Sequence, residues 1–194
     1  STIGVVTFNQ RQRDLIQDLL DQECAKDDEF ALRYEEAISR KDDNQDVGFF
    51  VKNLENVQGD ERDVMVFSTT FGRDESEVFR RNFGPIGQEG GERRLNVAVT
   101  RAKKKVIVVT SMPIDEISTA LLGASAPGAR MNPRDYLQLY LAYAKSVSLM
   151  DAAAATSILE RLRPNPLLSA EGEYESPFEL EVADAIRRLG HECV

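Results

Sequence analysis

The side chains of this 194-residue chain that are best suited to chemistry gather near residue 100. The basic residues of this cluster are Arg93, Arg94, Arg101, Lys103, Lys104 and Lys105. A guanidinium stays protonated at neutral pH and can contact two oxygens of one carboxylate or phosphate group. Acidic residues dominate residues 14–46 instead, so the two signs of charge are separated along the chain. This asymmetry indicates a functional face near residue 100.

The overall charge limits how such a face could be used. The net charge is −9, which argues against a protein that coats nucleic acid by bulk electrostatics, because phosphate neutralisation needs Lys and Arg. Any nucleic-acid contact must therefore be local. No apolar run reaches the roughly 20 residues that cross a bilayer. No basic leader precedes the first apolar run, so we expect no membrane partner and a cytoplasmic location.

The hydrophobic pattern predicts the elements that must position this face. Apolar runs predict strands at residues 3–8, 47–51, 64–69 and 105–110. Helical spacing predicts helices at residues 10–24, 29–39, 92–102, 133–147, 151–162 and 178–189. Strands that alternate with helices imply a parallel α/β sheet, and valine-dense strands indicate helices on both faces. Polar composition predicts a loop at residues 40–46, an exposed mobile loop at residues 71–91 and a solvated turn at residues 103–105.

Three segments at predicted strand edges have a specific pattern. Residues 57–63 read VQGDERD and residues 93–102 read RRLNVAVTRA. They resemble motifs V and VI of superfamily 1 helicases, in the Upf-like branch that includes the nonsense-mediated-decay helicase, where the motifs read QGxExD and RRLNVAxTRA. Residues 7–12, TFNQRQ, resemble motif IV, usually TPYxxQ, although Phe8 and Asn9 depart from it. The three lie in the expected order, each where a strand edge or helix is predicted.

The resemblance covers about residues 1–125 and implies a fold. It implies an α/β fold with a RecA-like, P-loop-NTPase-type parallel sheet flanked by helices and a C-terminal helical extension. We therefore assign residues 1–125 to a second RecA-like motor domain, residues 126–170 to the extension and residues 171–194 to the start of a truncated further domain. Residues 176–183, SPFELEVA, resemble the opening helix of a Vsr-type, restriction-endonuclease-like domain, which would imply a DNA repair or defence role. A generic amphipathic helix is the equal alternative for this tail.

The resemblance also implies an ATP site that is shared with a preceding motor domain. Arg101 would be the arginine finger, which stabilises charge on a transferring phosphoryl group. Arg94 lies two helical turns earlier and would brace motif V or a phosphate, so we assign both arginines to catalysis and to ATP binding. Glu61 would contact the nucleotide. Gly59 would permit a close backbone approach that a side chain would block.

Four further residues are implied to contact nucleic acid or to couple it to the nucleotide: Thr7, Gln12, Glu55 and Gln58. The implied partners are single-stranded nucleic acid, DNA favoured over RNA, and the N-terminal RecA-like domain of the same polypeptide. For Thr7 and Gln12 the alternative is a plain strand end and helix start, with Asn9 as the helix cap. A polar turn is the alternative for residues 57–63, and a solvated amphipathic helix for residues 93–102.

One motif of an ATPase is absent from the sequence. No GxxxxGK[ST] phosphate loop occurs. ATP and Mg²⁺ would therefore be held by the missing first motor domain, and this fragment alone should not hydrolyse ATP. The acidic pairs Asp28-Glu29 and Asp74-Glu75 do not follow the tip of an apolar strand, so we expect surface charges and assign no metal ligand.

Three functions are consistent with these features. The first is the motor domain of an ATP-dependent superfamily 1 helicase that steps along single-stranded DNA or RNA. The second is a catalytically idle RecA-like scaffold that targets a nuclease-like domain. The third is an ATPase that remodels protein rather than nucleic acid, which fits the acidic net charge.

Overall fold

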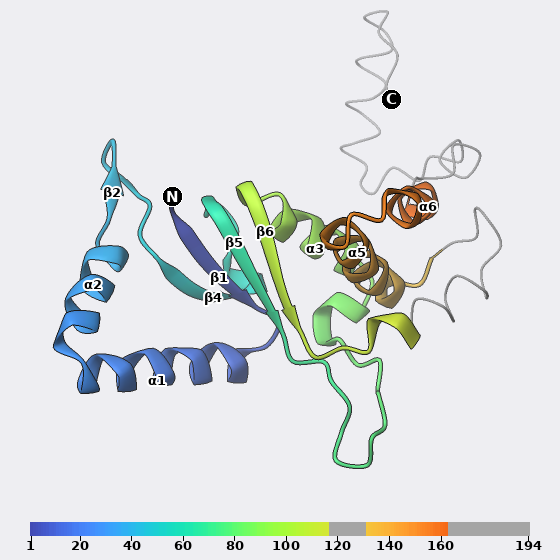
Figure 1. Ribbon diagram of the computed structural model, residues 1–194, viewed down its shortest axis with the longest axis horizontal. Coiled ribbons are helices and arrows are strands. Elements are labelled where there is room, and N and C mark those ends of the chain that lie inside the picture. Colours follow the sequence, from blue (N-terminus) through green and yellow to red (C-terminus); the bar gives the residue numbers. More distant parts are fainter. Residues whose placement is uncertain (117–130, 163–194) are drawn as a thin grey trace, which may run out of the picture. The chain divides into compact units, whose positions relative to one another are not determined.

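A four-stranded parallel sheet forms the centre of the fold. The computed structural model describes residues 1–116 and 131–162, which belong to one compact unit, Ser1–Leu162. The strands are β1 (Ile3–Thr7), β4 (Phe50–Asn53), β5 (Arg62–Thr69) and β6 (Ala102–Thr110), in the order β4-β1-β5-β6 (Figure 1). All neighbouring pairs are parallel. The predicted α/β, RecA-like sheet flanked by helices is thereby confirmed.

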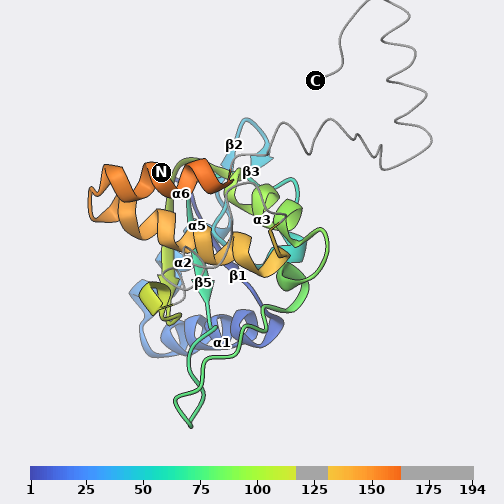
Figure 2. The same cartoon turned by 90° about the vertical axis from the view of Figure 1, so that its right-hand side faces the viewer.

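Helices lie on both sides of this sheet (Figures 1 and 2). On one side α1 (Gln10–Lys26) contacts β1 and β4, and α2 (Asp28–Ile38) packs against α1. On the other side α3 (Gly91–Val99) contacts β6 and also α5 (Pro133–Ser148), which in turn packs against α6 (Ala152–Leu162). The helices therefore match the predicted ones to within a few residues.

Side-chain caps fix where these helices begin. The Asn9 side chain accepts a hydrogen bond from the Gln12 amide and starts α1. Asn132 and Asp135 form a reciprocal capping box at the start of α5, whose first residue is Pro133. Such caps satisfy amide groups that have no partner within the helix, and each contributes about 1 kcal/mol.

The core lies between the sheet and the α3–α5 layer. Val6, Met65 and Phe67 point from the strands into it, and each is at most 1% exposed. Leu95 of α3 and Leu137 of α5 belong to the same cluster. The start of the predicted extension therefore shares its core with the sheet, because α5 supplies one of the most buried side chains.

The opposite face of the sheet is covered less completely. Ile107 and Val109 of β6 are 39% and 55% exposed, and α1 has no buried residue. The expectation that valine-dense strands are covered on both faces is wrong for β6. The reason is that α1 lies over β1 and β4, at the other end of the strand order.

Two segments predicted to be irregular contain strands. Residues 40–46 form a hairpin of β2 (Lys41–Asp42) and β3 (Gln45–Asp46), whose turn residues Asp43 and Asn44 have φ of 46° and 63°. Two successive positive φ values give a turn whose twist suits a hairpin. Residues 103–105, predicted as a solvated turn, belong to β6, because pairing with β5 already begins at Arg62 and Ala102.

The long segment 71–91 is not an exposed loop throughout. Phe83 and Ile86 are 1% and 2% exposed and belong to the main core. Phe71 packs on Phe83 with ring centroids 5.0 Å apart. A Cβ at Gly91 would lie only 1.9 Å from the Ile86 carbonyl oxygen, so the chain makes a close contact there. The glycines and the proline allow the turns, whereas the aromatic side chains anchor the segment.

Several predictions concern residues outside the described ranges. These are the linker at 124–129, the boundary at 169–175, the helix at 178–189 and the whole of 171–194, including the endonuclease-like tail. The domain boundaries at 125 and 170 also stay predictions. In the described ranges, no helix is both long enough and apolar enough to span a membrane.

Candidate functional site

The amino ends of β5 and β6 bring Glu61 and Arg101 together. The two strands are parallel and pair Arg62 with Ala102, so the residues that precede them are neighbours. The Arg62 amide donates a hydrogen bond to the Arg101 carbonyl at 3.1 Å. The Arg101 guanidinium lies 3.6 Å from the Glu61 carboxylate. Two segments that are 40 residues apart in sequence thus meet as one charged pair.

Arg101 is held in place but is accessible. Its Nε donates to the Val97 carbonyl at 3.0 Å, in the last turn of α3. Its side chain is 24% exposed and that of Glu61 is 49% exposed. The ammonium of Lys103 lies 3.7 Å from the other Glu61 oxygen. An ion pair between partly exposed groups stabilises a protein by less than about 1 kcal/mol, so an incoming anion could replace Glu61 as the partner of Arg101.

Gly59 shapes the turn that leads to Glu61. The Asp60 amide donates to the Val57 carbonyl at 3.1 Å, which closes a four-residue turn. Gly59 is the third residue of this turn and has φ +90°, a conformation that L side chains rarely adopt. A Cβ there would meet no atom within 4 Å, so backbone conformation rather than crowding favours glycine. Val57 is buried and Gln58 is exposed, so the turn presents Gln58 and open space above Gly59 to the outside.

The buried Arg62 side chain holds the backbone of this segment in place through hydrogen bonds. Only 3% of this residue is exposed. Its Nε donates to the Gly48 carbonyl at 2.8 Å, another guanidinium nitrogen donates to the Glu61 carbonyl at 2.9 Å, and its guanidinium carbon lies 4.8 Å from the centre of the Phe50 ring. Sequence reasoning missed this residue, because it is a variable position of the QGxExD pattern. In a regular strand, alternate side chains point to the same face, and this alternation could have indicated that Arg62 is buried. A register shift between Arg62 and Val64 interrupts the alternation.

Asp63 ties the beginnings of β1 and β5 together. It accepts a hydrogen bond from the Thr2 amide at 3.0 Å, and its own amide donates to the Thr2 hydroxyl at 2.9 Å. Lys104 lies 2.9 Å from its carboxylate. The hydrogen bond from Lys104, followed by that from Thr2, holds the pKa of Asp63 below its ordinary value. The carboxylate is therefore a structural clamp for the strands beside Glu61.

Arg94 has a different neighbour from Arg101. Its guanidinium donates to the Pro85 carbonyl at 3.0 Å. Pro85 lies in the short 3₁₀ helix η2 (Gly84–Gly87), which follows the core residue Phe83. Arg94 thus braces the segment before α3, and the structure does not bring it to Glu61.

The motif IV residues lie at the opposite, carboxyl edge of the sheet. Thr7 is fully buried, and its hydroxyl donates to the Asn9 carbonyl. The Gln12 amide nitrogen donates to the Ser68 hydroxyl at 2.6 Å, which links α1 to the end of β5. In this conformation both side chains organise the strand end, and neither belongs to the Glu61–Arg101 cluster. The eight residues of β5 separate the two edges by roughly 25 Å.

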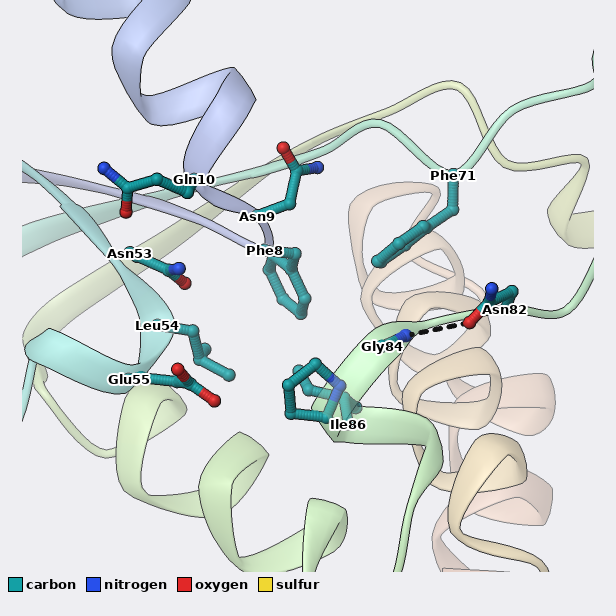
Figure 3. A pocket seen from close by; sticks show the side chains of 11 residues that line it. Phe8, Asn9, Gln10, Asn53, Leu54, Glu55, Phe71, Asn82, Gly84 and Ile86 are labelled. Atoms are coloured by element: carbon teal, nitrogen blue, oxygen red, sulfur yellow. Dashed lines mark hydrogen bonds between the residues drawn. The ribbon is translucent and has the colours of Figure 1, made fainter.

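Glu55 lies at the carboxyl edge too, beside a pocket of about 400 Å³ (Figure 3). It belongs to the 3₁₀ turn η1 (Leu54–Asn56), directly after β4. Phe8, Leu54 and Ile86 give the pocket an apolar lining, and Glu55 is at its polar side. Sequence reasoning placed Glu55 near a nucleic acid but did not find the pocket, because its walls come from four separate segments of the chain.

Comparison with known proteins identifies the family of this chain. Residues 1–113, more than half of the sequence, match the AAA domain family. The chain belongs to this AAA domain family. The matched residues include the Glu61–Arg101 cluster and every residue that lines the pocket of Figure 3. Both edges of the sheet thus belong to the AAA domain.

The relatives of this AAA domain are similar over a short part of their length. An uncharacterized ATP-dependent helicase of Mycoplasma genitalium is 43% identical over 105 residues, which make up 54% of this chain and 8% of that protein. Its homologue in Mycoplasma pneumoniae is 39% identical over 105 residues, again 54% of this chain and 8% of the relative. The chain is therefore a helicase-like domain that matches a small part of each relative. No solved structure gives a significant match.

One residue of each acidic pair of the AAA domain, Glu29 and Asp74, has a structural partner. Asp28 and Glu29 form the first turn of α2, and Glu29 pairs with Arg33. Asp74 accepts hydrogen bonds from the Val78 amide, the Arg80 guanidinium and the Ser76 amide. These bonds, with that from Val78 the largest contribution, hold the pKa of Asp74 below its ordinary value. Among the described residues, no three His, Cys, Asp or Glu side chains are grouped so as to hold a metal ion.

Proposed function

We propose that this chain is the second RecA-like motor domain of an ATP-dependent, superfamily 1, Upf-like helicase. The single observation that carries the proposal is the Glu61–Arg101 pair, 3.6 Å apart at the amino edge of β5 and β6. The resemblance assigns these two residues to one ATP site, and they come from segments that are distant in sequence. The names of the relatives, ATP-dependent helicases, agree with this function.

Arg101 would act on a nucleotide that the preceding motor domain binds. Bound ATP with Mg²⁺ supplies the transferring phosphoryl group, and the magnesium ligands and phosphate loop would belong to that other domain. The Val97 carbonyl orients the Arg101 guanidinium before any nucleotide arrives. When the cleft between the two domains closes, Arg101 would exchange Glu61 for phosphate oxygens and stabilise the charge that develops there.

Glu61 would then be available to the nucleotide itself. Its carboxylate can accept hydrogen bonds from ribose hydroxyls once Arg101 has turned toward phosphate. Gly59 leaves the adjacent space open, so a ligand can approach the backbone closely. Arg94 would contribute indirectly, by holding the segment that precedes α3 through the Pro85 carbonyl.

The connection between β4 and β5 would couple nucleic acid to nucleotide. Residues 54–61 run from Glu55 at the carboxyl edge to Glu61 at the amino edge. Leu54 and Val57 within this segment are 6% and 0% exposed, so the connection is packed against the core. A shift at Glu55 on binding a strand would thus reach Gln58 and Glu61 through a short, well-packed segment.

The whole protein would use single-stranded DNA rather than RNA as its track, in the cytoplasm and in DNA repair or defence. Its other motor domain would be the direct partner of this one. Because the chain covers 8% of each relative's length, these statements extend beyond the matched part. The chain alone is expected to be inactive as an ATPase, because its sequence contains no phosphate loop.

ATPase measurements on the full-length protein test the proposal. Turnover is compared without nucleic acid, with single-stranded DNA and with single-stranded RNA. The proposal expects stimulation by a single strand, DNA giving the larger effect. An ATPase that no nucleic acid stimulates would favour protein remodelling, and the absence of any ATPase would favour the idle scaffold.

A further inference from the structure

We infer that the pocket at the carboxyl edge of the sheet holds one unpaired nucleobase and prefers a base that carries an exocyclic amine. This inference rests on the proposed function and names a subsite for its single-stranded track. The pocket is lined by residues at or just after the carboxyl ends of three strands, β1, β4 and β5, and by the segment around η2 (Figure 3).

The position of the pocket is one where open α/β sheets bind ligands. The chain leaves β1 toward β4 through α1 and α2, but it leaves β5 toward β6 through α3. Since β1 and β5 are neighbours, the connections diverge in opposite directions between them. The crevice at the carboxyl ends of two such strands is the usual ligand site of an open sheet. Phe8 follows β1 and Phe71 follows β5, so both line this crevice.

The apolar part of the pocket suits a flat aromatic ring. Phe8 and Ile86 are 6% and 2% exposed and form its interior. Phe71 is half-buried, and its ring packs against Phe8 with centroids 6.1 Å apart. A volume of about 400 Å³ lies at the lower end of the roughly 300–1,000 Å³ of small-ligand pockets. Aromatic walls of this kind stack on bases of single strands.

The charge of the pocket excludes a phosphate. Among the described residues that line it, none is Lys or Arg. Arg94 contacts one wall through the Pro85 carbonyl but is not a lining residue. Glu55 is the one charged residue among the described residues that line the pocket, and its carboxylate would repel a phosphate. The pocket therefore fits a neutral base, while the sugar–phosphate chain would lie outside it.

The polar side of the pocket can read the edge of a base. The side chains of Glu55 and Asn53 make no hydrogen bond with any described residue. The Asn82 oxygen is occupied by the Gly84 amide at 3.3 Å, which leaves its amide nitrogen as a donor. A carboxylate accepts hydrogen bonds, and the exocyclic amine of cytosine is a suitable donor. Thymine has a carbonyl oxygen at the same position, which Glu55 would repel.

Binding of short oligonucleotides to the full-length protein tests this inference. Fluorescence anisotropy compares oligo(dC) with oligo(dT), two pyrimidine strands of equal length that differ at the ring position that Glu55 would contact. We expect the wild type to prefer oligo(dC) by roughly tenfold. Glu55→Ala should remove the preference, whereas Glu36→Ala, which removes an exposed carboxylate of α2, should keep it.

A second variant tests the stacking wall without losing the core. Phe71→Leu keeps an apolar side chain against Phe8 and Phe83 but removes the flat ring. This variant should bind both oligonucleotides, oligo(dC) and oligo(dT), about tenfold more weakly than the wild type. Equal affinity of the wild type for the two strands, a preference that survives Glu55→Ala, or unchanged binding by Phe71→Leu would each overturn the base pocket. If the wild type bound neither oligonucleotide in these titrations, the proposed helicase function would be refuted as well as the base pocket.

Discussion

Replacement of Arg62 by methionine should destabilise the fold strongly, although Arg62 is outside the proposed catalytic pair. The guanidinium donates to two backbone carbonyls, at 2.8 and 2.9 Å, and lies over the Phe50 ring. Hydrogen bonds from a charged group contribute about 1.5–3 kcal/mol each, and the ring contact adds about 1 kcal/mol. Methionine carries no charge, so the substitution also removes the cost of burying the guanidinium. This gain offsets several kcal/mol of the sum. We therefore expect a net loss of about 2–4 kcal/mol in the free energy of unfolding.

Urea denaturation of the chain measures this loss. Arg62→Lys should be intermediate, because an ammonium keeps the charge but cannot donate to both carbonyls in the same planar geometry. The matched control is Arg33→Met on α2, because the Arg33 side chain is 75% exposed and forms an ion pair with Glu29 at the surface. This control should change stability by less than about 0.5 kcal/mol. A loss below about 1 kcal/mol for Arg62→Met would refute the argument that Arg62 holds the backbone of Glu61.

Three further predictions concern single residues. Gly59→Ala should lower stability by about 1–2 kcal/mol because of φ +90°, and Gly59→Asn by less, since Asn adopts positive φ more readily; equal stability by urea denaturation would contradict this. The pKa of Asp63 is lowered in the folded state, so the Asp63 carboxylate stabilises the fold above pH 3.8, its ordinary pKa. This stabilisation is lost as the pH falls through the folded-state pKa. Asp63→Asn should therefore weaken the pH dependence of the melting temperature in that acid range. Burial, with the neighbouring Tyr143, raises the pKa of Tyr140 to about 12, so stability should fall as pH rises from 10 to about 12, and Tyr140→Phe should remove that part of the fall.

The sequence predicted the parallel sheet because its strong periodic signals came from local residues. The strands around residues 64–69 and 105–110 and the helices after Asn9 and Asn132 have clear apolar spacing or caps. The less predictable parts depend on contacts between distant segments. Lys103–Lys105 looks like a solvated turn by composition, yet pairing with β5 extends β6 through it.

The same distinction applies to the candidate site. The motif pattern singled out Glu61 and Arg101, and the register of β5 and β6 explains why they meet. Arg62 lies beside them but was not predicted, because its partners Gly48 and Phe50 come from another strand region. The pocket at the carboxyl edge could not be predicted either, since no local pattern indicates that four segments converge.

The turnover of ATP by Arg101→Ala in the full-length protein tests the central claim most directly. Lys103→Ala is the matched control, because Lys103 also lies near Glu61 but belongs to the strand. Turnover of Arg101→Ala should fall on the order of a thousandfold, with nucleotide affinity far less affected and with Lys103→Ala close to wild type. Wild-type turnover by Arg101→Ala would contradict the assignment of this guanidinium to a shared ATP site.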